Sequence, residues 1–373
     1  AVLGQDLAAV GPASDKLLVN VYFLWVFPVF RSSLNSRADF FLASFQNFRR
    51  QGLLFPLFCL ALLETFDLNA QLRALELVRL EAEESIGCDI RSSMKTLEVA
   101  RTAAGTPVYL DEHAAGAHYI LPVNRVKPHT CFKGPIESGC TKMAVVGFGK
   151  QPGAALIHSC GPEQMALRLL DGIAALQATG RLLGGVATVE SCAGAVVRVQ
   201  ALSSDEVGGS AERDLTAYAR SLVPQLPFTD IDVLIVERGG KDISGTTIDP
   251  NVSGRFWVHG LDDFPHPPAT IVLLSITEAS GGNVLGIGLA DFIPASVANA
   301  IDWEKTYLNC FTAGPSGVRR SRLPMVLPDE ESCIKAALSM CGKAVHEEKR
   351  VVRIRSTLHL ETCWVSDAVL ARR

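Results

Sequence analysis

Several features are missing from this chain, and each absence excludes a class of protein. None of the ten cysteines forms a CxxC pair, so neither a zinc ribbon nor a thioredoxin-type redox motif is expected. Basic residues are not in excess, because the formal net charge is -4, and a general nucleic-acid binder is therefore not indicated. Scattered cysteines in a long chain are typical of reduced, buried thiols, so we expect a cytoplasmic protein.

Long hydrophobic runs are also absent. Residues 17–30 form an apolar run of 14 residues, and residues 53–63 form one of 11. Both contain a proline, and both fall short of the roughly 20 apolar residues that a membrane-spanning helix needs. We expect each run to be a buried strand or helix rather than a membrane span or a signal peptide.

The residues that are present predict an α/β protein of two domains. The chain has 373 residues, 48% of them hydrophobic and 20% charged, which suits burial in more than one core. Strand and helix patterns alternate from about residue 105, and this alternation favours mostly parallel sheets. We place the boundary at the proline-containing turn of residues 224–227. The expected domains are residues 1–225, with residues 1–75 atypical, and residues 226–373, with an active-site cleft between them.

The expected elements follow from the length and spacing of the apolar runs. Helices are predicted at residues 73–84, 162–176 and 211–223. Strands are predicted at residues 119–123, 144–146, 197–202, 231–237 and 269–276. The last two strands are continuous, β-branched apolar runs, which are typical of strands covered on both faces.

Residues 124–158 have the composition of a functional site. The stretch contains His129 and His158 together with lysines, an acid at Glu137 and several glycines. Histidine suits proton transfer and metal ligation near neutral pH. Glycine lets the backbone approach a ligand closely. A hydrophobic core needs neither, so the stretch is a candidate site.

Single residues within this stretch leave alternatives open. Gly147, Gly149 and Gly153 form GxGxxxG, one residue longer than the dinucleotide fingerprint, so an NAD-dependent dehydrogenase is the weaker alternative. A glycine-lined turn that meets a phosphate or another cofactor edge fits better. His129 alone is equally a loop residue, although nearby cations would hold it neutral, as a general base requires. Residues 137–139 are equally a turn cap.

Longer motifs resemble a known family. The phrases NRVKPHT, ESGCTKM, GFGKQPGAALIH, GGKDISGTTIDPNVSGR and GNVLGIGLADF occur in this order and are followed by TLHLETCWVSDAVL. Together they resemble the lactate-racemase-like family of nickel-pincer hydroxyacid racemases and epimerases, from about Gly87 to the C-terminus. The resemblance implies an isomerase that inverts a 2-hydroxy acid.

The same resemblance implies a cofactor and roles for individual residues. In the family, a nicotinate-derived nucleotide carries nickel in a sulfur–carbon–sulfur pincer and is tethered to a lysine, which corresponds to Lys142. His158 corresponds to the histidine that completes the nickel coordination, and imidazole suits nickel. His129 corresponds to an acid/base that acts on the substrate hydroxyl. The glycines expected to border the cofactor are Gly139, Gly147 and Gly149.

A second loop is expected to hold the substrate. Loops beyond the carboxyl ends of parallel strands are where α/β proteins bind ligands. The loop after the strand at residues 231–237 contains Lys241, Asp249, Asn251 and Arg255. By resemblance it faces the cofactor, with Arg255 in a bidentate grip on the substrate carboxylate and Lys241 as a point charge. The alternative is that these residues are solvated charges and turn formers.

The N-terminal region departs from the family pattern. The family has a second acid/base histidine there, whereas residues 1–112 contain no histidine. His113 and His118 are the candidates to replace it. The departure keeps open a catalytically silent relative that binds a metabolite or a metal. The expected partners are a small 2-hydroxy acid and the proteins that synthesise the cofactor, without nucleic acid or membrane, and the sequence does not indicate the oligomeric state.

Overall fold

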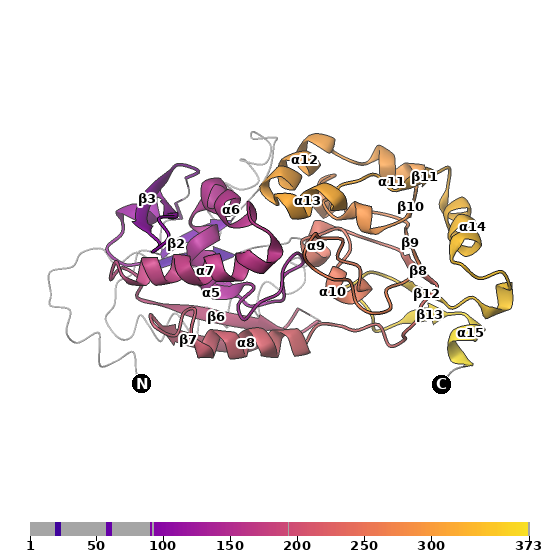
Figure 1. The fold of residues 1–373 in the computed structure, drawn as a ribbon, viewed down its shortest axis with the longest axis horizontal. Coiled ribbons are helices and arrows are strands. Elements are labelled where there is room, and N and C mark those ends of the chain that lie inside the picture. The colour runs from indigo at the N-terminus through magenta and orange to yellow at the C-terminus, as the bar shows by residue number, and fades with distance from the viewer. Residues whose placement is uncertain (1–18, 24–56, 62–89, 92, 193, 372–373) are drawn as a thin grey trace.

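The computed structural model describes residues 19–23, 57–61, 90–91, 93–192 and 194–371, and the helix predicted at residues 73–84 lies outside them. The described strands form a five-stranded sheet, a six-stranded sheet and a two-stranded sheet. Figure 1 shows the five-stranded and six-stranded sheets at opposite ends of the molecule, with short helices and loops between them.

The first sheet is mostly parallel and has the strand order β2-β1-β5-β6-β7. Only the neighbours β6 and β7 run antiparallel. Its strands are β1 (Val19–Phe23), β2 (Leu57–Ala61), β5 (Val123–Arg125), β6 (Gly184–Glu190) and β7 (Val196–Ser203). Both N-terminal apolar runs therefore contain a strand, and the strand predicted at residues 197–202 is confirmed. The strand predicted at residues 119–123 is displaced, because β5 begins at Val123 while Ile120 forms only an isolated bridge.

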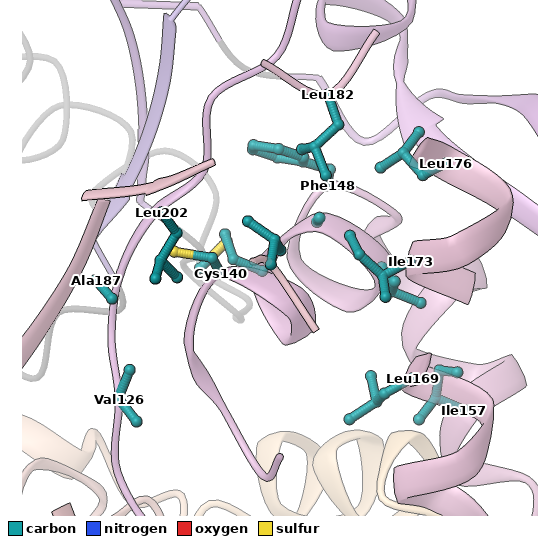
Figure 2. Close-up of a cluster of buried hydrophobic side chains, with 14 of the residues drawn as sticks. Val126, Cys140, Phe148, Ile157, Leu169, Ile173, Leu176, Leu182, Ala187 and Leu202 are labelled. Atoms are coloured by element: carbon teal, nitrogen blue, oxygen red, sulfur yellow. The ribbon is translucent and has the colours of Figure 1, made fainter. Parts of the chain in front are cut away.

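Helices and a hairpin surround this sheet. They are β3 (Thr96–Arg101), β4 (Pro107–Asp111), α4 (Glu112–Gly116), α5 (Gly139–Lys142), the π-helical turn η2 (Met143–Gly147), α6 (Lys150–His158), α7 (Pro162–Gln177) and α8 (Ser210–Ser221). The helices predicted at residues 162–176 and 211–223 are confirmed. Side chains of α5, α6 and α7 gather with those of β6 and β7 in one hydrophobic core, where Cys140, Leu169 and Leu202 are among the residues in Figure 2.

The strand predicted at residues 144–146 is wrong. These residues lie in η2, which continues α5 without a break. Three apolar residues carry no usable period, so they fit a buried helix as well as a buried strand. Tertiary packing decides between the two, because the Val145 side chain occupies the space above Gly172 of α7, where a Cβ would lie 2.8 Å from Val145 Cγ1.

The second sheet has the order β11-β10-β9-β8-β12-β13, and all its neighbours are parallel except β12 and β13. Its strands are β8 (Val233–Val236), β9 (Thr270–Leu273), β10 (Phe292–Pro294), β11 (Met325–Leu327), β12 (Val351–Ile354) and β13 (Cys363–Val365). Val233 and Ile235 of β8 face the core beneath α14 (Glu330–Met340), while Leu234 and Val236 face a second core. Both faces are covered, as the continuous apolar runs predict.

Short helices surround the second sheet. This sheet and its helices form the second half of the molecule, and the five-stranded sheet with its helices forms the first half. The helices around the second sheet are α9 (Lys241–Ser244), α10 (Pro250–Ser253), η3 (Glu278–Ser280), η4 (Ile287–Leu289), α11 (Ala295–Asn299), α12 (Trp303–Thr312), α13 (Pro315–Arg320), η5 (His346–Glu348) and α15 (Asp367–Leu370). In Figure 1, α12 lies beside α6 and packs against α13, and α9 and α10 lie between the two large sheets.

The α/β class with mostly parallel sheets is thus confirmed. The predicted boundary at residues 224–227 falls in the irregular segment between α8 and β8 and stays a prediction. None of the helices in the described part of the chain combines the length and apolarity needed to span a bilayer.

A buried carboxylate joins α8 to the start of α5. Glu212 is fully buried, and its carboxylate accepts hydrogen bonds from the Thr141 backbone N–H at 3.0 Å and the Thr141 hydroxyl at 2.6 Å. The same carboxylate accepts the N–H of Gly208 at 2.8 Å. The first N–H groups of a helix have no partner within the helix, and an acid there satisfies them. Burial is the main reason that the pKa of Glu212 is raised.

Replacement of this carboxylate is expected to destabilise the first half. Glu212→Ala leaves several buried donors without an acceptor, and we expect the free energy of unfolding to fall by about 2–4 kcal/mol. Chemical denaturation monitored by circular dichroism measures the loss. The matched control is Asp214→Ala, an exposed acid on the same helix, which should change stability little. Equal stability of the two variants would contradict the anchoring role of Glu212.

Candidate active site

His129, Lys142 and His158 lie together in the structure. Lys142 ends α5, His158 ends α6, and His129 lies in the loop after β5. The Lys142 Nζ atom is 2.5 Å from the His129 Nε2 atom. The centroids of the two imidazole rings are 6.1 Å apart, and the rings are tilted by 39°. An amine and two imidazoles therefore share one small region.

His129 contacts Lys142 through one ring nitrogen and the neighbouring loop through the other. Its Nε2 atom contacts the Lys142 Nζ atom, and its Nδ1 atom accepts the backbone N–H of Cys131 at 3.2 Å. The Cys131 thiol also lies 3.2 Å from Nδ1. The tautomer of His129 decides which atom donates in the contact with Lys142.

Burial keeps both imidazoles neutral. The pKa of His129 lies well below its usual 6.5, first because burial disfavours the charged ring and then because Lys142 and His158 are close. The pKa of His158 is lowered to about 3, again by burial first and then by Lys142. A neutral imidazole is the form needed both by a general base and by a metal ligand.

Lys127 is a further amine at this region that sequence reasoning did not single out. Burial, followed by the nearby charge of Arg125, lowers the pKa of Lys127 to about 7. Its Nζ atom lies 3.9 Å from where a Cβ of Gly245, at the end of α9, would stand. The Lys127 backbone is held by Ser138, whose hydroxyl accepts its N–H and donates to its carbonyl, both at 2.6 Å.

Glu137 positions the loop that carries His129. The fully buried carboxylate accepts the backbone N–H of His129 at 2.7 Å and that of Gly134 at 3.1 Å. Arg220 of α8 completes the set with an ion pair of 2.5 Å. Of the two readings that the sequence leaves open, a turn cap therefore describes Glu137.

Asn251 and Asp249 bring the second half to the same region. The Asn251 side chain donates to the carbonyl of His129 at 3.3 Å and accepts from Lys133. Asp249 caps α10 by accepting the N–H of Asn251 at 2.8 Å. Burial raises the pKa of Asp249, while its hydrogen bonds to Asn251 and the charge of Lys127 oppose the rise. Both residues thus lie where the sequence predicts a substrate loop.

Lys241 and Arg255 have different surroundings. Lys241 opens α9, and its N–H donates to the Ser280 hydroxyl at 2.9 Å. Arg255 is 4% exposed and donates to Asp291 at 2.7 Å. Its remaining contacts are with the backbone carbonyls of Leu289, Pro268 and Ala269. The guanidinium therefore ties loops of the second half together, and its role in substrate binding stays a prediction.

The three glycines predicted at the cofactor are each required by close packing of the protein. A Cβ on Gly139, which has a φ of +82°, would lie 2.5 Å from a carboxylate oxygen of Glu212. A Cβ on Gly149 would lie 2.7 Å from the carbonyl oxygen of Val145. A Cβ on Gly147 would lie 2.2 Å from the sulfur of Met143. Their contact with a cofactor stays a prediction.

The context of these glycines does not fit a dinucleotide-binding turn. That fingerprint needs a strand before the glycines and a helix after them. Here the residues before Gly149 form η2 and those after it form α6. The alternative of an NAD-dependent dehydrogenase therefore loses its structural basis.

The candidate replacements for the missing histidine belong to α4 and the segment after it. His113 is in α4, which packs against the hairpin of β3 and β4, and His118 is exposed just after that helix. Neither lies in the loop that carries His129.

Arg320 also lies in this region, although it is distant from the other site residues in sequence. It ends α13 in the second half, and its Nη1 atom donates to the carbonyl of Thr130 at 3.0 Å across 190 residues. No motif or spacing in the sequence connects the two residues.

No cluster of three or more His, Cys, Asp or Glu residues that could hold a metal ion occurs in the described ranges. If a metal binds within these ranges, other donors have to complete its coordination.

Comparison with known proteins supplies a fold. No family model matches the sequence, and no curated protein matches it. Among solved structures, the lactate racemase apoprotein from Thermoanaerobacterium thermosaccharolyticum superposes with a TM-score of 0.52 at 13% identity, covering 92% of this chain and 86% of that one.

A protein from Thermotoga maritima superposes with a TM-score of 0.45 at 10% identity, covering 89% of this chain and 83% of that one. A TM-score below 0.5 does not establish a shared fold. At 13% identity the first similarity concerns the fold alone. The expectation from the sequence motifs is met at that level: this chain has the fold of lactate racemase.

Proposed function

We propose that this protein is a racemase or epimerase of a 2-hydroxy acid that works with a nickel-pincer nucleotide tethered to Lys142. The observation that carries the proposal is the contact of Lys142 with His129, beside His158. The family resemblance and the lactate racemase fold give these three residues their proposed roles.

The residues present fit the proposed cofactor. A tether needs an amine at the site, and Lys142 supplies one in contact with His129. His158 Nδ1 is buried and has no hydrogen-bond partner in the described part of the chain, which leaves a nitrogen lone pair suited to nickel. A pincer that brings its own sulfur and carbon donors needs little more from the protein.

The mechanism divides the work between cofactor and side chains. When bound, the cofactor would supply an acceptor and donor of hydride for the substrate C2. His129 is the residue that takes the hydroxyl proton, because its imidazole is buried and neutral. Glu137 holds the His129 backbone, so that the His129 ring stays beside Lys142, the residue that would hold the cofactor.

Loading of Lys142 is the first test. We expect the full chain, expressed with the proteins that synthesise the cofactor, to carry a covalent adduct on Lys142 and bound nickel, because Lys142 supplies the amine for the tether. Peptide mass mapping and metal analysis measure both. Lys142→Arg should carry neither, whereas the exposed control Lys335→Arg should carry both. An unmodified Lys142, with machinery that loads a known racemase, would retire the proposal.

The two histidines are expected to fail in different ways. His158→Ala should keep the Lys142 adduct but lose nickel, because it removes a ligand. His129→Gln should keep adduct and nickel but lower racemisation by about 10²–10⁴-fold, because it removes the acid/base. Adduct mass, nickel content and chiral analysis of a 2-hydroxy-acid panel separate these effects, with the exposed His266→Gln as control. Nickel retained without His158, or full turnover without His129, contradicts the assignment of roles.

The pH dependence follows from the buried imidazole. A base must be neutral in the free enzyme, and the pKa of His129 lies well below 6.5. We therefore expect kcat/KM for racemisation to remain level as the pH falls to 6.5 and to decline only at lower pH, when His129 becomes protonated. A pH profile measured with loaded enzyme checks this. A decline centred above 6.5 would show that His129 is not the titrating base.

A catalytically silent relative is the second candidate. It is favoured by the absence of histidine from residues 1–112, since His113 and His118 belong to α4 and the segment after it rather than to the His129 loop. Such a protein would bind a metabolite or a metal without turnover. Racemisation of any acid in the panel by nickel-loaded protein excludes it.

A further inference from the structure

Arg320 presents an unsatisfied edge at the candidate site. The residue is 2% exposed, and its Nη1 atom is held by the carbonyl of Thr130. Its Nε and Nη2 atoms are buried and make no hydrogen bond to the part of the chain that the structure describes. Buried N–H groups of a charged side chain are costly to leave unpaired. A hydrogen-bond acceptor at this edge would therefore stabilise the structure.

The two free nitrogens are the pair that recognises a carboxylate. In a planar guanidinium, Nε–H and one N–H of Nη2 point in parallel from the same edge. Two parallel donors match the two oxygens of a carboxylate in a bidentate pair. Because Nη1 is anchored to the backbone, the plane of the group and the direction of this edge are fixed before a ligand arrives.

The surroundings of Arg320 favour an anion. Arg320 donates to the carbonyl of Thr130, the residue after His129, so the two side chains belong to the same region. Burial is the first cause of the lowered pKa of His129, and the positive charges of Lys142, Lys127 and Arg320 add to it. Cys131 and then Asp249 are the acidic groups that act on Arg320, and the Oδ1 atom of Asp249 already accepts two hydrogen bonds from Asn251. No ion pair of Arg320 occurs within the described residues.

Arg255 offers no comparable edge. Both of its terminal nitrogens donate to protein acceptors, to Asp291 and to backbone carbonyls. Of these two buried arginines, Arg320 is the one whose donors remain for a ligand.

We propose that Arg320 binds the carboxylate of the 2-hydroxy-acid substrate through its Nε and Nη2 edge. The anchoring carbonyl belongs to Thr130, which follows His129 in the chain. In a 2-hydroxy acid the carboxylate is on the carbon next to the one that bears the hydroxyl. An arginine that holds C1 beside an imidazole that serves the C2 hydroxyl therefore matches this substrate class. The inference rests on the proposed function, because His129 receives its role there.

Binding of a small probe tests the inference without turnover. Glycolate is the smallest 2-hydroxy acid, glycolamide is its neutral counterpart, and inorganic phosphate represents the phosphate group of a nucleotide. Each is titrated into the full chain without cofactor, and broadening of the glycolate or glycolamide proton signal, or of the phosphate phosphorus signal, reports binding. We expect the protein to bind glycolate in preference to glycolamide and phosphate.

Two substitutions of Arg320, with a substitution of the neighbouring Arg319 as control, test whether Arg320 binds the probe. Arg320→Met should abolish glycolate binding, and Arg320→Lys should weaken it about tenfold or more, because lysine cannot supply two parallel donors. Arg319→Met, an exposed arginine beside it, should bind glycolate as the unchanged protein does. Thermal unfolding checks each fold, and if the methionine variant does not fold, the lysine variant decides.

Several results would overturn the proposal. They are absence of glycolate binding, equal binding of glycolamide, a preference for phosphate, and full binding by a folded Arg320→Lys variant. The outcome is independent of cofactor loading. An unmodified Lys142 with Arg320-dependent glycolate binding rejects the proposed function and leaves Arg320 as a carboxylate-binding residue. A Lys142 adduct with glycolate binding that does not depend on Arg320 keeps the proposed function and rejects the role of Arg320.

Discussion

Burial of positively charged groups with few acidic partners is the constraint on which the candidate site depends. Burial is the first cause of the lowered pKa of His129, His158, Lys127 and Arg320. A low-dielectric region disfavours every charge that is not compensated. The imidazoles respond by staying neutral, which is the form that chemistry with a metal or a hydroxyl requires. Arg320 cannot lose its proton in this way, so its charge persists and an anion is its natural partner.

Buried carboxylates hold the backbone of the candidate site in place through hydrogen bonds. The helix α8, which is distant in sequence, contributes to both of these anchors. Glu212 of α8 holds the first turn of α5, whose last residue is Lys142. Glu137, supported by Arg220 of α8, holds the backbone of His129. One helix thus contributes to the position of both reacting groups. The glycines serve the same end, because they let η2, α6 and α7 approach closely enough to bring the ends of α5 and α6 together.

The fold class could be predicted from the sequence because buried apolar residues recur with the spacing of the helix or strand that carries them. The apolar runs of β8 and β9 and the amphipathic patterns of α7 and α8 mark their elements with little ambiguity. Residues 144–146 were mispredicted because three apolar residues fit either kind of element, and only the packing of Val145 against Gly172 decides. The candidate site was accessible in part, because His129, Lys142 and His158 lie in one short stretch with recognisable motifs.

The sequence by itself determined which chemical groups this protein can bring to a site and that strands and helices alternate around them. Local spacing and composition carry that information, since they act between near neighbours. Tertiary structure alone decided which groups meet. It placed Arg320 against Thr130, 190 residues away in the chain. It also paired Arg255 with Asp291, so that this arginine joins loops of the second half. The physical reason is that desolvation and hydrogen-bond satisfaction depend on every element packed around a side chain, and those elements are distant in sequence.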